Sequence, residues 1–172
     1  MKFELPQEKH EQMFKIFVDE MKQHGETVIP GDGCCSLYSD FKEWLQFDKQ
    51  LREETYIPDG YVGGTTYFVV EDNQMVGTVN IRHQLNEYLY QSGGHIGYSV
   101  AVSKRRQGIA TAMLMFAIEE CLKMGIQDIL VTCKKGNIAS RKTIEKCGGQ
   151  LENEIDIDHK KILRFWIKGE EK

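Results

Sequence analysis

The run Arg105-Arg106-Gln107-Gly108-Ile109-Ala110 decides the fold of this chain, because it joins a strand-like segment to a helix-like one. Residues 95–102 before it predict a strand, and residues 108–124 after it predict a helix that ends at Gly125. The first amides of a helix have no intrahelical partner, and the helix dipole adds partial positive charge there. A basic, glycine-containing turn at this place therefore favours a bound phosphate, and we expect a ligand that carries a diphosphate.

Composition limits the class of protein. A length of 172 residues predicts one domain, 1–172, with a real hydrophobic core. The net charge of −4 argues against nucleic acid as the main partner. No apolar run approaches the roughly 20 residues that span a bilayer, and the start lacks the apolar core of a signal peptide, so we expect a cytoplasmic protein without a membrane partner. The five cysteines form no C-x-x-C pair, which predicts reduced thiols and no zinc site.

The order of the expected elements indicates a mixed α+β sheet and not a doubly wound one. Residues 85–90 fit either a short helix or an ordered loop, and Asn137 fits the N-cap of a helix. The second helix is marked by Leu37, Phe41, Trp44, Leu45 and Leu51, with Ser39 or Asp40 near its start. The other elements are a helix at 8–24, a hairpin of strands 65–71 and 75–83 that turns at Asp72-Asn73-Gln74, a strand at 95–102, a helix at 108–124, a strand at 127–133, a helix at 137–147, and closing strands at 151–157 and 162–168.

The chain resembles the GNAT N-acetyltransferase superfamily. The resemblance is carried by Arg105-x-x-Gly108-x-Ala110 after a strand, by a second strand that ends at Cys133, and by Asn137-x-x-Ser140, which opens the next helix. Residues 80–86 and 94–100 resemble more closely one subgroup of predicted acetyltransferases, whose acceptor does not come with the name. The resemblance implies the GNAT acyl-CoA N-acyltransferase fold, a mixed, mostly antiparallel sheet that is flanked by helices and has splayed central strands.

The same resemblance implies acetyl-CoA as the cosubstrate, with no metal. Backbone groups at the end of the strand would pair with the pantetheine arm as if it were another strand, and the thioester would lie in the gap. Amides from Gln107 to Thr111 would hold the pyrophosphate, with Arg105 and Arg106 assisting from the rim. The cofactor contacts implied in this way are Val100, Ala101, Val102, Arg105, Arg106, Gln107, Gly108, Ile109, Ala110, Thr111, Asn137 and Ser140.

Acetyl transfer to an amine needs a base, because an alkylammonium with a pKa of about 10.4 must first lose a proton. His95 is the first candidate, since GNAT relatives often place a base at the start of this strand; the alternative is a histidine that only bonds the preceding glycine loop. His83 and Glu87 are the other candidates, in the segment expected to border the acceptor. Arg82 and Asn86 of the same segment either bind the acceptor or order the loop.

The leaving thiolate also needs a proton or a hydrogen-bond donor. Many GNAT relatives place a catalytic tyrosine seven residues after the helix asparagine, and this chain has Ile144 there. Tyr98, Ser140 or water would have to serve, or the thiolate leaves unaided. For Tyr98 the alternative is a tyrosine that packs in the core, and for Ser140 a plain residue of the first helical turn.

The leading hypothesis is an N-acetyltransferase that moves an acetyl group from acetyl-CoA directly to a primary amine of a small molecule or peptide. The alternative is a non-catalytic acyl-CoA-binding module with a regulatory or sensor role, which the missing tyrosine favours. An NAD or ATP enzyme is excluded by motif, because no G-x-G-x-x-G follows the first strand and no glycine-rich loop ends in Gly-Lys-Ser/Thr. GNAT folds often pair as dimers, so the resemblance leaves a homodimer open.

Overall fold

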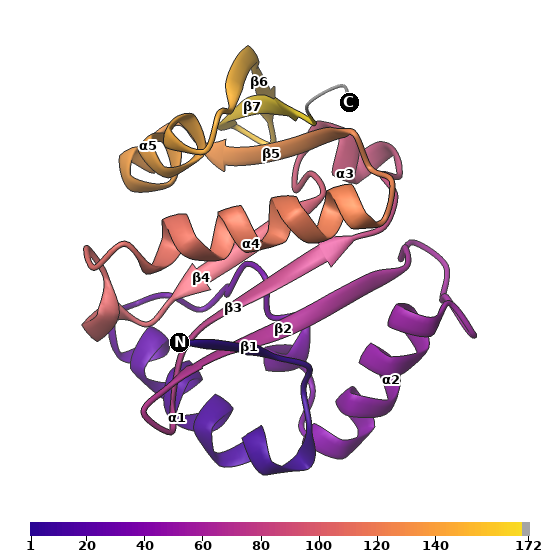
Figure 1. Cartoon of the computed structure of the whole chain (residues 1–172), viewed down its shortest axis with the longest axis vertical. Helices are drawn as coiled ribbons and strands as arrows, with labels where there is room; N and C mark the ends of the chain where they lie inside the picture. The colour runs from indigo at the N-terminus through magenta and orange to yellow at the C-terminus, as the bar shows by residue number, and fades with distance from the viewer. Residues whose placement is uncertain (170–172) are drawn as a thin grey trace.

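The strands form two antiparallel sheets, one in the middle of the molecule and one at its upper end in Figure 1. The computed structural model describes residues 1–169. The first sheet has the strand order β1-β2-β3-β4 and the second has the order β5-β7-β6. Because β4 and β5 belong to different sheets, the predicted α+β fold with splayed central strands is confirmed. The strands are β1 (Lys2–Glu4), β2 (Gly64–Glu71), β3 (Gln74–Arg82), β4 (Ile96–Val100), β5 (Asp128–Lys134), β6 (Gln150–Ile157) and β7 (Lys160–Lys168).

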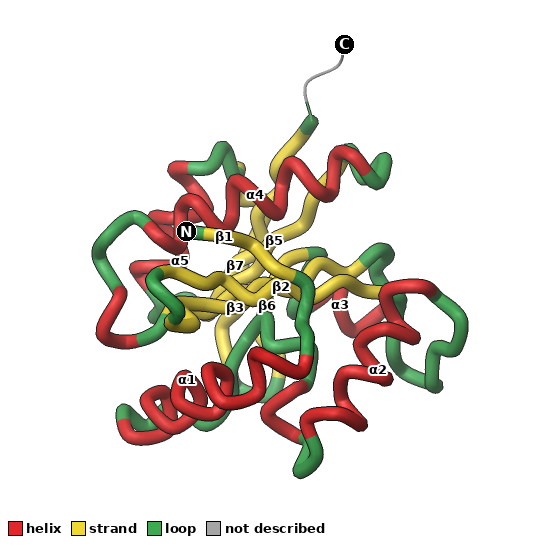
Figure 2. Tube along the Cα trace, turned by 60° about the horizontal axis from the view of Figure 1, so that its bottom comes forward, coloured by secondary structure: helices red, strands yellow, loops and turns green. Residues whose placement is uncertain are grey.

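Helices cover both faces of the first sheet. Figure 2 shows α4 on one side of the strands and α1 and α2 on the other. The α-helices are α1 (Glu11–Gln23), α2 (Phe41–Glu53), α3 (Glu87–Gln91), α4 (Ile109–Lys123) and α5 (Ile138–Lys146), and short 3-10 turns lie at Glu8–His10, Cys35–Leu37 and Val102–Lys104. Within residues 1–169, no helix combines the length and the apolar character needed to cross a membrane.

Successive side chains of β2 point to opposite faces of the first sheet, and each face has its own hydrophobic core. Phe68 faces α1 and α2, where its ring centroid lies 5.4 Å from that of Phe14 and 5.6 Å from that of Trp44. Val69 faces the other way and packs in the cluster that contains Met113 of α4. Aromatic side chains of the first two helices therefore anchor those helices to the sheet.

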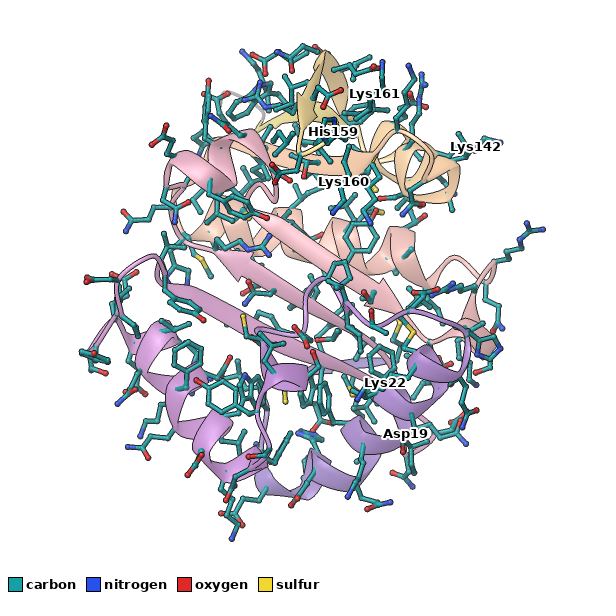
Figure 3. The ribbon with its side chains drawn as sticks, turned by 180° about the vertical axis from the view of Figure 1, so that it is seen from behind. Asp19, Lys22, Lys142, His159, Lys160 and Lys161 are labelled. Carbon is teal, nitrogen blue, oxygen red and sulfur yellow. The ribbon has the colours of Figure 1, made fainter. Side chains whose placement is uncertain are left out.

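Two tight turns close the hairpins of the sheets. Asp72 and Asn73 adopt φ angles of +49° and +59°, the left-handed pair typical of a two-residue hairpin, so the turn predicted there is confirmed. Asp158 and His159 do the same between β6 and β7, with φ angles of +50° and +61°. Figure 3 shows that His159 lies close to Lys160 and Lys161 at this end of the molecule.

The structure also corrects the predicted boundaries. The strand β1 was not predicted, because three residues are too few to show an alternating pattern; it pairs with β2 at Phe68–Val70. Asp40, one of the two residues predicted near the start of α2, accepts hydrogen bonds from the first amides of the helix and so begins it. Leu37 consequently lies outside α2, in an exposed 3-10 turn. Val102 lies in the 3-10 turn after β4, so the predicted strand 95–102 ends two residues early.

Candidate functional site

The N-terminus of α4 has no side chain to cap it. Gly108 stands at the N-cap with φ +80°, and the first backbone bond of the helix runs from the amide of Ala112 to the carbonyl of Gly108. The amides of Ile109, Ala110 and Thr111 therefore have no intrahelical partner. A Cβ added at Gly108 would meet nothing within 4 Å. Glycine is needed here for its left-handed backbone, and the space beside it is open to a ligand.

The two arginines before Gly108 have different surroundings. Arg105 forms a two-pronged ion pair with Glu26, with N–O distances of 2.7 Å and 2.8 Å, and its Nε donates to the carbonyl of Val100 at 3.2 Å. Arg106 is exposed, with φ +60°, and has no ion pair within residues 1–169. The Arg105 side chain therefore connects the loop to β4 and to the segment after α1. The Arg106 side chain remains available to bind a phosphate.

The edge of β4 that faces β5 is unpaired beyond its first residues. The amide of Ala101 donates to the carbonyl of Val76 in β3. In an antiparallel strand the backbone N–H and C=O groups of successive residues point alternately to the two sides, so those of every second residue of β4 point away from β3. The amides of Tyr98 and Val100 consequently point to the gap between the sheets. The carbonyl of Val100 already accepts a hydrogen bond from Arg105, so the amide is the group of Val100 that most needs a partner.

His95 holds the two sheets together where the gap begins. Its amide donates to the carbonyl of Leu130 at 2.7 Å, and the amide of Leu130 donates to its Nδ1 at 2.9 Å. The side chain is buried, and burial, with Arg82 nearby, lowers the pKa of His95 to about 4. The ring is thus neutral with Nδ1 already occupied, and this geometry speaks against the role of base predicted for His95.

Tyr98 spans the gap further along. Its hydroxyl lies 2.9 Å from the hydroxyl of Ser140 in the first turn of α5. Burial raises the pKa of Tyr98 to about 12, although the bond to Ser140 opposes this shift, so the phenol keeps its proton at neutral pH. Ile144, at the position where GNAT relatives carry a tyrosine, is fully buried in the core. The structure therefore brings the two predicted hydroxyl donors together.

Asn137 begins α5 as predicted. Its Oδ1 accepts the amide of Ser140 at 3.0 Å, which leaves its Nδ2 as a donor. Cys133 is the last residue but one of β5 and lies in the core, where burial raises the pKa of its thiol to about 11. The thiol therefore stays protonated at neutral pH and fits packing better than nucleophilic chemistry.

His83 lies in a chain of polar side chains that the sequence did not reveal. Its Nδ1 is 2.8 Å from Oε1 of Glu54, at the end of α2, and its Nε2 is 2.9 Å from Oγ1 of Thr65. Asn86 caps α3 by accepting the amide of Leu89, and its Nδ2 donates to the carbonyl of Gly60 in the loop between α2 and β2. Neither Glu54 nor Thr65 has a local sequence signal, because they are 29 and 18 residues from His83.

The two remaining residues of the predicted acceptor segment differ in burial. Arg82 is half-buried, and its Nη1 donates to the carbonyls of Gly93 and Gly94. Glu87 is exposed in the first turn of α3, with no ion pair within residues 1–169. In the same residues, no group of three or more His, Cys, Asp or Glu side chains is placed to hold a metal.

The unpaired edge of β4 and the uncapped start of α4 suit a long ligand with a diphosphate at one end, as in the acyl-CoA-dependent transferases. A model of the acetyltransferase (GNAT) family matches residues 32–149, so the chain belongs to the GNAT acetyltransferase family. Acetyl-CoA is accordingly its cosubstrate. No protein with a curated description matches the chain.

Many solved structures share the fold. RimJ of Mycobacterium smegmatis, in complex with CoA-disulfide, is 21% identical with a TM-score of 0.70, over 96% of this chain and 80% of its own. The Salmonella typhimurium acetyltransferase that modifies the N-terminal serine of ribosomal protein L7/L12 is 18% identical with a TM-score of 0.68, over 98% and 94%. A point mutant of spermidine N-acetyltransferase SpeG from Vibrio cholerae is 14% identical with a TM-score of 0.64, over 98% and 95%. At these identities the likeness establishes the fold.

Proposed function

We propose that this enzyme moves an acetyl group from acetyl-CoA directly to a primary amine of a small molecule or peptide, in the gap between β4 and β5. The observation that carries the proposal is the meeting of free helix amides and an unpaired strand edge at that gap. Similar structures include enzymes named for a ribosomal protein and for spermidine, so both kinds of amine are acceptors within the fold. All five cysteines are unpaired, which supports a reducing cytoplasm.

The chain would hold acetyl-CoA, which supplies the activated acetyl group, mostly through its backbone. The free amides of α4 suit the pyrophosphate, with Arg106 at the rim and Gln107 in the turn. The amides of Tyr98 and Val100 suit the pantetheine arm and the thioester oxygen, whose negative charge grows during transfer. Nδ2 of Asn137, at the start of α5, is a further donor.

We assign the base to His83. A carboxylate behind Nδ1 fixes the ring with its proton on that nitrogen, so Nε2 presents a lone pair toward Thr65. The hydroxyl of Thr65 can then pass a proton from the acceptor amine to Nε2. Glu87 is the less suitable alternative, because it is exposed and no contact orients it.

We assign the donor for the leaving sulfur to the Tyr98–Ser140 pair. The two hydroxyls share one hydrogen bond across the gap, so the second hydroxyl proton is free to be donated to a ligand beside the pair. A buried phenol that stays neutral can donate at all physiological pH values. The pair would thus replace the tyrosine that is absent at Ile144.

The test is an acetylation assay over a panel of amines and amino-terminal peptides, with the acetylated product read by mass because the cysteines would react with a thiol dye. We expect turnover with at least one class of acceptor. Micromolar acetyl-CoA binding without turnover of any panel member would instead identify a non-catalytic acyl-CoA-binding module.

A further inference from the structure

Arg82 is the last residue of β3, and only part of its hydrogen-bonding capacity is used. Its Nη1 donates to the carbonyls of Gly93 at 3.0 Å and Gly94 at 3.3 Å. Within residues 1–169, Nε and Nη2 have no protein acceptor, and neither atom is sealed from solvent. Nε and Nη2 form one edge of the planar guanidinium, and this edge matches the two oxygens of a carboxylate.

The charge of Arg82 is also without a direct counter-ion. No carboxylate of residues 1–169 lies within 4 Å of its guanidinium. Burial lowers the pKa of Arg82, and the nearby Cys34, Tyr88 and Asp32 oppose that shift. Both oxygens of Asp32 already accept backbone amides, from Cys34 and Ser36. An arginine nevertheless stays charged, so Arg82 keeps a half-buried positive charge.

The other arginines of the described chain show that this is unusual. Arg52, Arg105 and Arg141 pair with Asp48, Glu26 and Glu145 respectively. Arg164, which is the more buried, pairs with Glu152 and lies over the ring of Tyr90. Arg106 lacks a carboxylate but is exposed. Among residues 1–169, Arg82 is thus the arginine withdrawn from solvent without a carboxylate.

The guanidinium of Arg82 lies against the strand assigned to the thioester. A Cβ added at Gly97 of β4 would lie 3.1 Å from Nη2 and 3.3 Å from Nη1 of Arg82, and 3.1 Å from the amide of Gly31. Gly97 directly precedes Tyr98, whose amide points to the gap. The free edge of the guanidinium is therefore close to the site of transfer, where a residue larger than glycine at position 97 would press against it.

We propose that Arg82 binds a carboxylate of the acceptor, so that the acceptor is an amine with a carboxylate close to its amino group, as in an α-amino acid. This inference rests on the proposed acetyl transfer and names the substrate class for that site. A bidentate ion pair would supply the counter-ion that the chain lacks and would fix the amine relative to β4. A polyamine offers no anion and would be repelled, and an internal peptide carbonyl offers one neutral oxygen in place of two charged ones.

The test compares each α-amino acid of a panel with its own α-amide, which keeps the side chain and the amine and removes only the negative charge. The amide has the lower amine pKa and so more free amine near pH 8, which biases the comparison against the proposal. We expect kcat/KM for the acids to exceed that for the amides by about tenfold or more, as for a charged hydrogen-bond pair. Arg82→Gln should abolish that preference while acetyl-CoA binding by calorimetry stays unchanged.

Arg141→Gln is the matched control, because Arg141 pairs with Glu145 on the surface of α5, and the variant should keep the preference. Because Arg82 also bonds two loop carbonyls, its variant could misfold, so a second measurement uses the wild type alone. Calorimetry on the CoA-loaded protein should show N-acetyl amino acids binding at least about tenfold tighter than N-acetyl amino amides. Equal turnover of acids and amides, or a preference that survives Arg82→Gln, would overturn the carboxylate assignment and leave acetyl transfer standing. Acetyl-CoA binding without turnover of any amine would instead overturn the proposed function.

Discussion

The two strand–helix units on either side of the gap, β4–α4 and β5–α5, begin their helices in opposite ways. α4 starts at a left-handed glycine with no capping side chain, and β4 has an unpaired edge. α5 starts at Asn137, which caps its own helix, and β5 pairs along its length with β7. One unit leaves backbone groups free for a ligand, and the other satisfies its own. We therefore expect the first unit to bind the cofactor through its backbone and the second unit mainly to frame the site, with Nδ2 of Asn137 as the one cofactor contact of that unit to be tested.

The contact that joins the two units should show the largest effect. His95→Ala removes a buried ring and leaves the amide of Leu130 without a partner, which should lower the free energy of unfolding by about 3 kcal/mol near neutral pH. His95→Gln, whose side-chain oxygen can accept that amide, should recover part of the loss. Urea unfolding of the three proteins measures the difference, and a loss below about 0.5 kcal/mol would show that His95 does not hold the sheets together.

The same histidine sets a pH dependence of stability. Its pKa in the folded state is lowered from 6.5 to about 4, so the folded protein binds this proton less readily than the unfolded chain. The contribution of His95 is therefore complete above pH 6.5 and is lost as the pH falls toward 4. The wild type should lose stability more steeply over this interval than His95→Gln. A pH–rate profile that loses its acidic limb in His95→Gln, with stability unaffected, would return His95 to the role of base.

The free start of α4 gives the next effect. Gly108→Glu strains the left-handed backbone at the start of α4 and puts a carboxylate beside the free amides, where it repels the pyrophosphate. The substitution should weaken CoA binding by on the order of 100-fold. Gly108→Ala carries the strain without the charge and separates the two causes. Arg106→Ala should weaken CoA binding less than Gly108→Glu does. Titration calorimetry that gave the reverse order would show that side-chain charge, and not the backbone, holds the cofactor.

The local features of both units were predictable from the sequence, and the contacts between them were not. The cap at Asn137 and the hairpin turn at Asp72-Asn73 depend on neighbouring residues, so composition and spacing identify them. The hydrogen-bond partners of His95 and Arg105 lie 35 and 79 residues away, so no local sequence pattern indicates them. The sequence therefore predicts a cofactor loop from local pattern alone, but it could not show that the side chains of Arg105 and His95 bond to distant segments of the fold.

The hydroxyl pair across the gap should show a smaller effect, on the rate alone. Tyr98→Phe keeps the packing of the ring and removes the donor, so kcat should fall by about tenfold while acetyl-CoA affinity is unchanged. Ser140→Ala should cost less, because the phenol keeps its own proton. Steady-state kinetics with calorimetry separates the two quantities. An unchanged kcat in Tyr98→Phe would mean that the sulfur leaves with water as its only donor.

The smallest effect is expected at Asn137. Its variants test whether the β5–α5 unit only frames the site or also contacts the cofactor. Asn137→Ala should lower the free energy of unfolding by about 1 kcal/mol, the usual cost of a lost cap. Asn137→Ser keeps a capping oxygen, so it should restore most of that stability, but it lacks the Nδ2 donor. If both variants weaken CoA binding, Nδ2 contacts the cofactor and the second unit also binds. If the serine variant binds CoA as the wild type does, Asn137 serves only to start α5, and the division between a binding unit and a framing unit holds.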